Sequence, residues 1–155
     1  MKKTALLLSA FMWLNTAAAQ TTFSGNVVRI LDGDTVEILD QQKTTIRVRL
    51  ANIDAPEKKQ AFGEVARQAL AKMAYRQDVQ VTDRGGDRYG RRIGVLTVNG
   101  KELNSAMVAQ GMAWVYARYN TDPSLPGIEQ KARAERIGLW ADTNPTPPWE
   151  FRHAR

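Results

Sequence analysis

The segment Asp54-Ala55-Pro56-Glu57 has the residue types and spacing of a site for a hard cation. It places two carboxylates three residues apart, directly after an arginine-bearing stretch. Pro56 fixes one backbone angle and favours an extended Ala55, so the carbonyl and side-chain directions are held stiffly. Carboxylate and carbonyl oxygens are the ligands that calcium takes in proteins. The alternative interpretation is a helix start, with Asp54 as the cap and Glu57 favouring the helix dipole.

A second acidic pair lies upstream, in Asp32-Gly33-Asp34. Asp-Gly is common in tight turns, so Asp32 alone is explained by turn chemistry. Asp34 lies just past the turn at a strand start, where aspartate is a poor strand former, so its carboxylate needs a partner. We expect Asp34, Asp54 and the Ala55 carbonyl to supply three oxygen ligands to calcium, with water molecules completing the shell.

Arginines at two places complement these acids. Arg49 occupies a strand position whose opposite face is apolar, which places its guanidinium on the outside of the sheet. The loop Arg88-Tyr89-Gly90-Arg91-Arg92 follows the flexible pair Gly85-Gly86, and its alternative interpretation is a solvated hairpin tip. Two guanidinium groups and a divalent cation can together hold a phosphodiester and neutralise charge that grows on its oxygens.

Several other chemistries are excluded by the residues that the chain lacks. It contains no cysteine, so thiol catalysis and cysteine-based metal sites are ruled out. Its single histidine, His153, stands close to the C-terminus after a proline-rich stretch, a poor place for a histidine triad or a zinc site. No glycine-rich phosphate loop of the Gly-x-x-x-x-Gly-Lys type occurs, and EF-hand spacing is not met after Asp32.

The elements that must position these residues follow from hydrophobic periodicity. Alternating or clustered apolar residues predict five strands, at 27–31, 35–39, 44–50, 79–81 and 93–98. Helical spacing predicts three helices, at 62–75, 102–110 and 126–137. Five strands interrupted by a helix after the third predict a mainly β fold with α-helices, a five-stranded OB-fold barrel with about three packed helices. A two-layer α+β sheet is the alternative.

The chain is expected to divide into three parts. A basic start, an apolar run and small residues at 17–19 predict a signal peptide over 1–19, too short to span a membrane, and hence a bacterial periplasmic or secreted protein. Residues 20–141 form one domain, and the proline-rich tail 142–155 is expected to lack regular structure at 144–148. The excess of 22 Lys and Arg over 16 Asp and Glu suits a polyanionic partner.

Taken together, these segments resemble the staphylococcal nuclease (thermonuclease) family, from about Ser24 to Trp140. Five blocks occur in the order of the family, at 32–36, 49–57, 87–91, 110–113 and 138–140. The resemblance implies an OB-fold and a monomeric, calcium-dependent phosphodiesterase that acts on DNA and RNA with little sequence specificity and leaves 3′-phosphate ends. It implies no protein partner, and no membrane association of the mature form.

The resemblance also implies roles for the acidic segment. Asp34 and Asp54 correspond to the calcium carboxylates, and Ala55 to the residue that gives its main-chain carbonyl, where the family often has threonine. Glu57 corresponds to the carboxylate proposed to activate the attacking water.

The basic and aromatic residues receive roles in the same way. Arg49 and Arg91 correspond to the two phosphate-binding arginines. Arg88, Tyr89 and Tyr119 fall where the family contacts phosphate or nucleotide.

Two features depart from the best-known member of the family. The stretch 58–62 is shorter than the corresponding loop, and of two tyrosines that flank the nucleotide only Tyr119 has a counterpart. The other position is Ala117, with Tyr116 one residue away. Two rival functions stay open at this point: a non-catalytic OB module that binds nucleic acid, and a secreted protein that binds anionic cell-surface polymers.

Overall fold

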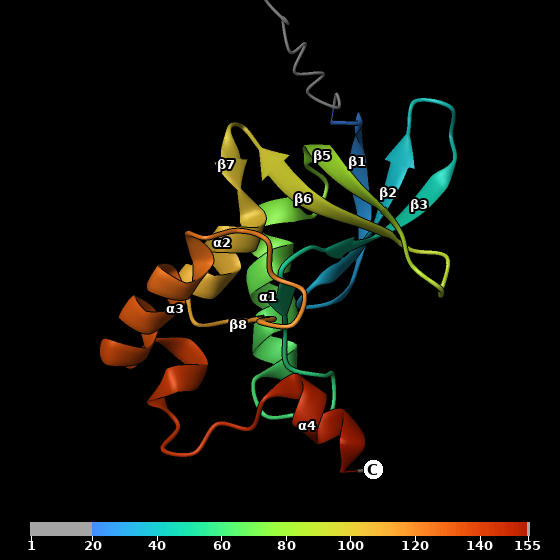
Figure 1. Cartoon of the computed structure of the whole chain (residues 1–155). Helices are drawn as coiled ribbons and strands as arrows, with labels where there is room; N and C mark the ends of the chain where they lie inside the picture. Colours follow the sequence, from blue (N-terminus) through green and yellow to red (C-terminus); the bar gives the residue numbers. More distant parts are fainter. Residues whose placement is uncertain (1–19, 155) are drawn as a thin grey trace, which may run out of the picture.

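Three strands at the start of the described chain pair as an antiparallel meander (Figure 1): β1 (Thr22–Asp32), β2 (Thr35–Asp40) and β3 (Thr45–Leu50). They are seen in a computed structural model, which describes residues 20–154. The predicted signal peptide, residues 1–19, lies outside the described residues. Each predicted strand is found, and β1 begins five residues earlier than its apolar core suggested.

A second pair of strands closes the sheet into a barrel. β5 (Asp78–Gly86) pairs with β1 and with β6 (Arg92–Val98), and β6 then pairs in parallel with β3. The closing register puts Val48 opposite Arg92. The strand order β3-β2-β1-β5-β6 with the β3–β6 pairing is that of a closed five-stranded barrel. The OB-fold prediction is therefore confirmed, and the open two-layer sheet is wrong.

Three short strands were not predicted. β4 (Ile53–Asp54) pairs with β8 (Trp114–Val115) outside the barrel, and β7 (Lys101–Glu102) extends the β6 edge. Two-residue strands are too short to show a period in the sequence. β4 matters for the site because its pairing with β8 fixes the backbone that carries Asp54.

The helices gather at one end of the barrel (Figure 1): α1 (Gly63–Ala74), α2 (Leu103–Ala109), α3 (Leu125–Ala134), a 3-10 turn η1 (Gly138–Ala141) and α4 (Pro148–His153). The first three confirm the predicted helices. α3 ends three residues before its predicted end, because the positive φ of Arg136 turns the chain away from the helix axis. None of the helices within residues 20–154 has the length and apolar character needed to cross a membrane.

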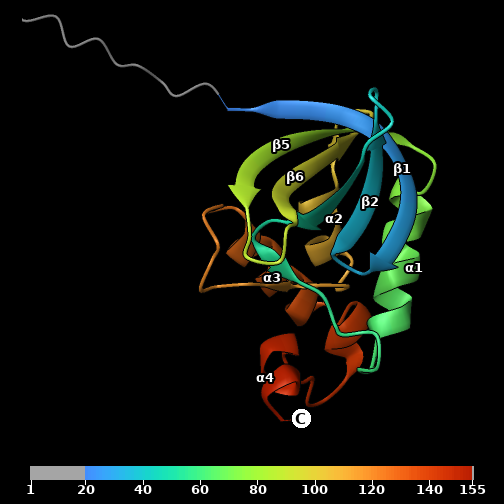
Figure 2. The same cartoon turned by 90° about the vertical axis from the view of Figure 1, so that its right-hand side faces the viewer.

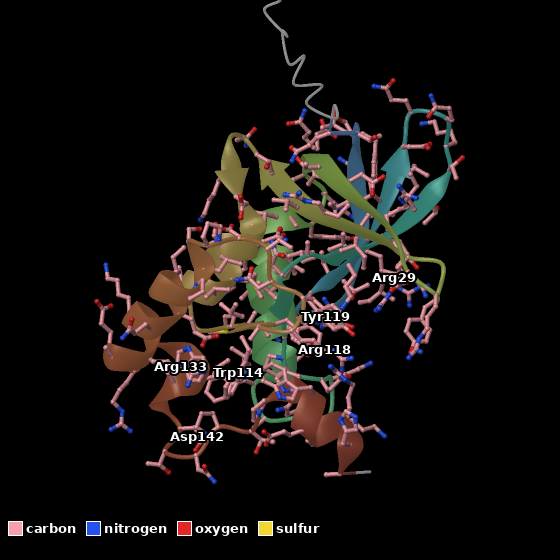
Figure 3. The ribbon with its side chains drawn as sticks, in the orientation of Figure 1. Arg29, Trp114, Arg118, Tyr119, Arg133 and Asp142 are labelled. Carbon is pink, nitrogen blue, oxygen red and sulfur yellow. The ribbon has the colours of Figure 1, made fainter. Side chains whose placement is uncertain are left out.

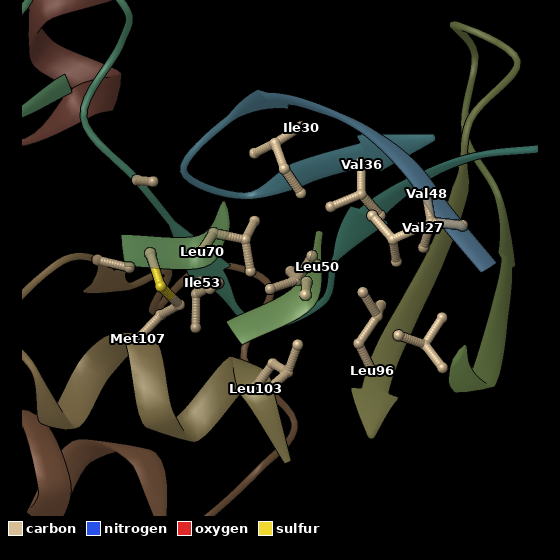
Figure 4. Close-up of a cluster of buried hydrophobic side chains, with 14 of the residues drawn as sticks. Val27, Ile30, Val36, Val48, Leu50, Ile53, Leu70, Leu96, Leu103 and Met107 are labelled. Atoms are coloured by element: carbon tan, nitrogen blue, oxygen red, sulfur yellow. The ribbon is translucent and has the colours of Figure 1, made fainter. Parts of the chain in front are cut away.

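The main hydrophobic core lies inside the barrel and continues between the barrel and α1 and α2 (Figure 4). In β3 the burial alternates, with Val48 and Leu50 fully buried and Arg47 exposed, as the period of a strand requires. A second apolar cluster lies between α3, η1 and α4, and it is built on Trp114, Ala132, Leu139 and Trp140 with Trp149 packed against it.

Two glycines join the end of α2 to η1. Gly111 and Gly138 both have positive φ, of 62° and 59°. A Cβ on Gly111 would lie 2.1 Å from the Ile137 carbonyl oxygen, and one on Gly138 would lie 2.4 Å from the Gly111 oxygen. Only glycine allows both the backbone angles and this close approach. The blocks at 110–113 and 138–140 are therefore structural and do not contribute side chains to the chemistry.

The tail has no regular structure at 144–147, as predicted, but the prediction is wrong at Pro148, where a helix begins. Pro148 is the first residue of α4, a position where proline costs no hydrogen bond. Figure 2 shows α4 at the end of the molecule opposite the start of β1, below the green loop that leads into α1. The tail therefore folds back over the segment that follows Asp54.

Candidate active site

The structure brings Asp34 and Asp54 together around one arginine. Arg49 Nη2 lies 3.3 Å from Asp34 Oδ2 and 2.8 Å from Asp54 Oδ1. Both acids are buried, with 6% and 1% of their surfaces exposed. Asp34 lies in the turn directly before β2, and Asp54 ends β4, so both β2 and β3 separate the two acids in the chain.

Arg49 is held rigidly and lies deeper than expected. Its Nη1 donates to the carbonyls of Leu50 at 3.1 Å and Ile53 at 2.9 Å, and the ring of Tyr116 lies 5.9 Å from the guanidinium carbon. Its side chain is only 13% exposed. The sequence placed this guanidinium on the barrel surface, whereas the short β4 and the β8 segment cover it. A guanidinium fixed in this way keeps its orientation when an anion arrives.

The Asp54 segment is hydrogen-bonded directly to the hairpin turn. The Ala55 amide donates to Asp34 Oδ2 at 2.8 Å, and Thr35 Oγ1 donates to Asp34 Oδ1 at 2.9 Å. At the turn itself, a Cβ on Gly33 would lie 2.8 Å from the Ala55 Cβ. Glycine is therefore needed at the turn for close packing, and Asp34 and Ala55 are held at a fixed separation.

The turn residue Asp32 also faces the site. Its Oδ1 accepts from the Asp34 amide at 3.1 Å, as turn chemistry predicts. Burial, together with the neighbouring Asp34 carboxylate, raises the pKa of Asp32 to about 7. Burial also opposes ionisation of Asp34, but the Arg49 charge and the Ala55 amide outweigh it and lower the pKa of Asp34. Burial raises the pKa of Asp54 despite its arginine partners.

The acid side chains and the Ala55 carbonyl offer oxygen donors alone. A raised carboxylate pKa indicates negative charge that the protein compensates incompletely, and a hard divalent cation supplies that compensation. Within residues 20–154 no cluster of three or more His, Cys, Asp or Glu groups is arranged as a metal site. Two carboxylates, one carbonyl and waters nonetheless suit calcium, which takes carbonyl and water ligands as readily as carboxylates.

Helix capping does not explain Asp54 and Glu57. α1 begins only at Gly63, and its N-cap residue is Phe62. The intervening residues make a separate turn: the Gln60 amide donates to the Glu57 carbonyl at 2.8 Å, and the Glu57 amide donates to Gln60 Oε1 at 3.0 Å. The alternative interpretation as a helix start is therefore wrong, and the two carboxylates are available for other partners.

A second guanidinium beside these acids was missed by the sequence analysis. Arg152, on α4, places Nη2 at 2.7 Å from Asp54 Oδ2 and Nη1 at 2.7 Å from Glu57 Oε1. The signal for it was weak: a proline that can begin a helix, followed by aromatic residues at 149 and 151 that can anchor one. Nothing in the sequence indicates where such a helix docks.

Arg91 lies in the β5–β6 loop and is held by its own loop. Its Nε donates to Asp87 Oδ2 at 2.7 Å, while Asp87 Oδ1 accepts from the amides of Arg91 at 3.0 Å and Tyr89 at 2.9 Å. Burial opposes the charge on Asp87, yet these bonds lower its pKa. The β3–β6 register brings the base of this loop beside the strand of Arg49. Among the described residues, the contacts of Arg91 are with its loop and not with Asp34 or Asp54.

The predicted nucleotide-contacting residues are exposed. Tyr89 is 67% exposed, and its hydroxyl accepts from Arg88 Nη2 at 2.7 Å. Tyr119 is 58% exposed and packs edge-on against Tyr116, with 4.8 Å between ring centroids. Arg118 lies over the Tyr119 ring, and Figure 3 shows this pair between the barrel and α4. Because Tyr116 also contacts Arg49, the aromatic pair borders the buried acids.

Residues 47–142 match the family model described as staphylococcal nuclease homologue. The chain is 45% identical to an uncharacterized endonuclease of Escherichia coli O157:H7, over 97% of this chain and 96% of that protein. It is 47% identical to a micrococcal nuclease of Shigella flexneri, over 94% of this chain and 90% of that one. With a staphylococcal-like nuclease of Arabidopsis thaliana it shares 36% identity over 87% of this chain, which corresponds to 41% of the plant protein.

Proposed function

The chain belongs to the staphylococcal nuclease family and is a nuclease, and from this premise we propose that it cleaves DNA and RNA in a calcium-dependent reaction that leaves 3′-phosphate ends. The observation that carries the proposal is the pair of buried carboxylates, Asp34 and Asp54, held around the fixed guanidinium of Arg49. Neither a module that only binds nucleic acid nor a protein that binds cell-surface polymers needs this buried arrangement.

The residues that hold the cation are proposed to be Asp34, Asp54 and the carbonyl of Ala55. Bound there, calcium supplies Lewis-acid polarisation of the scissile phosphate and a position for the attacking water. The chain supplies the geometry: the Ala55 amide bonded to Asp34 keeps the first and third ligands together, and the β4–β8 pairing fixes Asp54.

The protein's own groups then act on the phosphodiester. Arg49, held by two backbone carbonyls, donates to a phosphate oxygen and stabilises its growing charge. Glu57, whose side chain is 35% exposed, accepts the proton of the attacking water or orients it. Arg91 approaches the phosphate from the β5–β6 loop, where Asp87 holds its guanidinium. Arg88, Tyr89 and Tyr119 contact the flanking phosphates and bases.

The test uses purified protein and single-stranded DNA or RNA, with calcium or with a chelator. We expect cleavage in calcium only, and products that a polymerase extends only after phosphatase treatment, because their 3′ ends carry phosphate. Replacing Glu57 by Gln or Arg91 by Ala should lower turnover roughly 10²-fold or more. A matched control is Arg47→Ala, which removes an outward arginine two positions from Arg49 that pairs with Glu37 at 2.8 Å. Full cleavage in chelator would reject the calcium dependence, and full activity of Glu57→Gln would reject the assigned base.

We also propose that the enzyme acts outside the cytoplasm. The support is in the sequence: the basic start Met1-Lys2-Lys3, the apolar run 4–14 and the small residues 17–19 have the order of a cleaved signal peptide. N-terminal sequencing of protein recovered from the periplasm or medium of an expressing bacterium should begin at Gln20. A chain that retains Met1 and stays in the cytoplasmic fraction would contradict export.

A further inference from the structure

The C-terminal helix α4 brings a cation of its own into the site. Arg152 donates to both oxygens of Asp54, from Nη2 to Oδ2 at 2.7 Å and from Nη1 to Oδ1 at 3.1 Å, and Nη1 also donates to Glu57 at 2.7 Å. One guanidinium thus bridges the carboxylate proposed to bind calcium and the carboxylate proposed to act on water. Asp54 and Glu57 stand 98 and 95 residues before Arg152 in the chain, so only the tertiary fold creates this contact.

The position of α4 rests on contacts other than this ion pair. Trp149 stacks on Tyr116 with an interplanar angle of 2° and packs edge-on against Trp114. Upstream of the helix, Gln60 Nε2 donates to the Thr146 carbonyl at 2.6 Å, which fastens the tail to the turn after Glu57. These contacts place the helix beside the site, and the Arg152 ion pair adds to the order of the helix.

Arg152 and a divalent cation compete for the oxygens of Asp54 in this arrangement. Arg152 is a partner of both Asp54 oxygens, and the only other side chain bonded to them in the described structure is Arg49, on Oδ1. A calcium ion bound to Asp54 would lie within a few ångströms of the Arg152 charge, and like charges repel strongly there because Asp54 is buried. Arg49 is held by two backbone carbonyls, so Arg152, which is partly exposed, is the guanidinium that can move away. Arg152 must therefore leave Asp54 when the cation binds.

We propose that Arg152 is an internal counter-ion that occupies the Asp54–Glu57 pair in the cation-free enzyme, and that calcium must displace it. This inference rests on the calcium dependence proposed above. Displacement lowers the apparent calcium affinity by the fraction of molecules in which Arg152 is already away from the acids. It also frees Glu57 from its guanidinium partner, so the water-activating carboxylate becomes available only when the cation site is filled.

The physical consequence is a link between cation binding and the order of α4. By reciprocity, whatever weakens the hold of Arg152 strengthens calcium binding by the same factor, and calcium loosens α4. The ion pair is partly exposed, with 37% of the Arg152 side chain open to solvent, so displacement requires no opening of the barrel. Water can hydrate the guanidinium once it has left the acids.

The first measurement is calorimetric calcium binding to the whole protein without nucleic acid. Arg152→Gln should bind calcium roughly tenfold more tightly than the wild type. The matched control is Arg67→Gln on α1, which removes a guanidinium that bonds only Glu64 among the hydrogen bonds of the described residues, at 2.9 and 2.6 Å, and should leave affinity unchanged. Equal or weaker affinity in Arg152→Gln would overturn the proposal.

The second measurement separates displacement from a simple change of charge. Amide hydrogen exchange in 149–154 should rise when calcium is added to the wild type, and should be fast already in Arg152→Gln and unaffected by calcium. Unchanged or slower exchange in calcium-bound wild type would show that Arg152 keeps its place, which would overturn the proposal while leaving calcium dependence intact. Absence of calcium binding in both proteins would instead reject the calcium site itself, and this inference with it.

Discussion

Replacement of Gly63 by alanine should disturb Glu57 without touching any side chain of the site. Gly63 is the first residue of α1, and a Cβ there would lie 2.0 Å from the Glu57 carbonyl oxygen and 2.9 Å from its carbonyl carbon. Real contacts of a Cβ with backbone atoms essentially never fall below 3.0 Å, so the Glu57 backbone and the start of α1 must separate by at least 1.0 Å. Neither atom is the end of a flexible side chain.

The magnitude follows from this shift. A misplacement of about 1 Å in a catalytic group typically costs about 10²-fold in rate. We therefore expect kcat for single-stranded DNA in calcium to fall about 10²-fold, with a much smaller change in KM. The matched control is Gly127→Ala in α3, where an added Cβ meets nothing within 4 Å. That change removes a helix-interior glycine and should stabilise the fold by about 0.5–1 kcal/mol with no effect on kcat.

The assay combines steady-state cleavage with urea unfolding of each variant at the same temperature. Unfolding curves establish that Gly63→Ala is fully folded under assay conditions, so that lost activity reports geometry and not lost protein. A folded Gly63→Ala enzyme with kcat within threefold of the wild type would refute the reasoning that the turn between Glu57 and α1 fixes the carboxylate proposed to act on water.

Three further predictions concern stability. Asn104 is 1% exposed, and its side chain accepts from the Leu96 amide at 3.0 Å and donates to the Ala51 carbonyl at 2.9 Å. Because Asn104→Ala leaves each of these two buried groups without its partner, it should lower the free energy of unfolding, measured in urea, by roughly 2–5 kcal/mol. A loss under 1 kcal/mol would contradict this. The ion pair with Arg92 lowers the pKa of Asp83 below its ordinary 3.8, so its stabilisation is present above that pH and is lost as pH falls through the folded value. Asp83→Asn should therefore be less stable at pH 7 and lose less stability than the wild type on acidification below about pH 4, and parallel acid profiles would count against it. Calcium at about 100 times its Kd should stabilise the protein by about 2.7 kcal/mol, and a chelator should remove this gain; a melting temperature indifferent to both would argue against a native-state calcium site.

The sequence was sufficient for the barrel and for the acids because their signals are local. The strand period of two shows which residues face inward, and the paired turns at 32–33 and 40–43 set the meander, so the β1–β3 register follows from neighbouring residues. Asp34 and Asp54 were predicted to meet because each stands at a strand end, and Arg49 precedes Asp54 by only five residues. The family resemblance extended this to roles for Glu57 and Arg91.

Long-range contacts could not be predicted from the sequence because no hydrophobic period or residue spacing encodes them. The choice between helix capping and a ligand role for Asp54 depended on where α1 begins, and the structure places that start nine residues downstream, at Gly63. The burial of Arg49 depends on β8, from a segment more than sixty residues later in the chain. The presence of Arg152 among the acids depends on Trp149 docking against Tyr116. The sequence by itself determined a barrel that carries two neighbouring carboxylates and an arginine, whereas only packing between distant segments decided that a second guanidinium lies beside them.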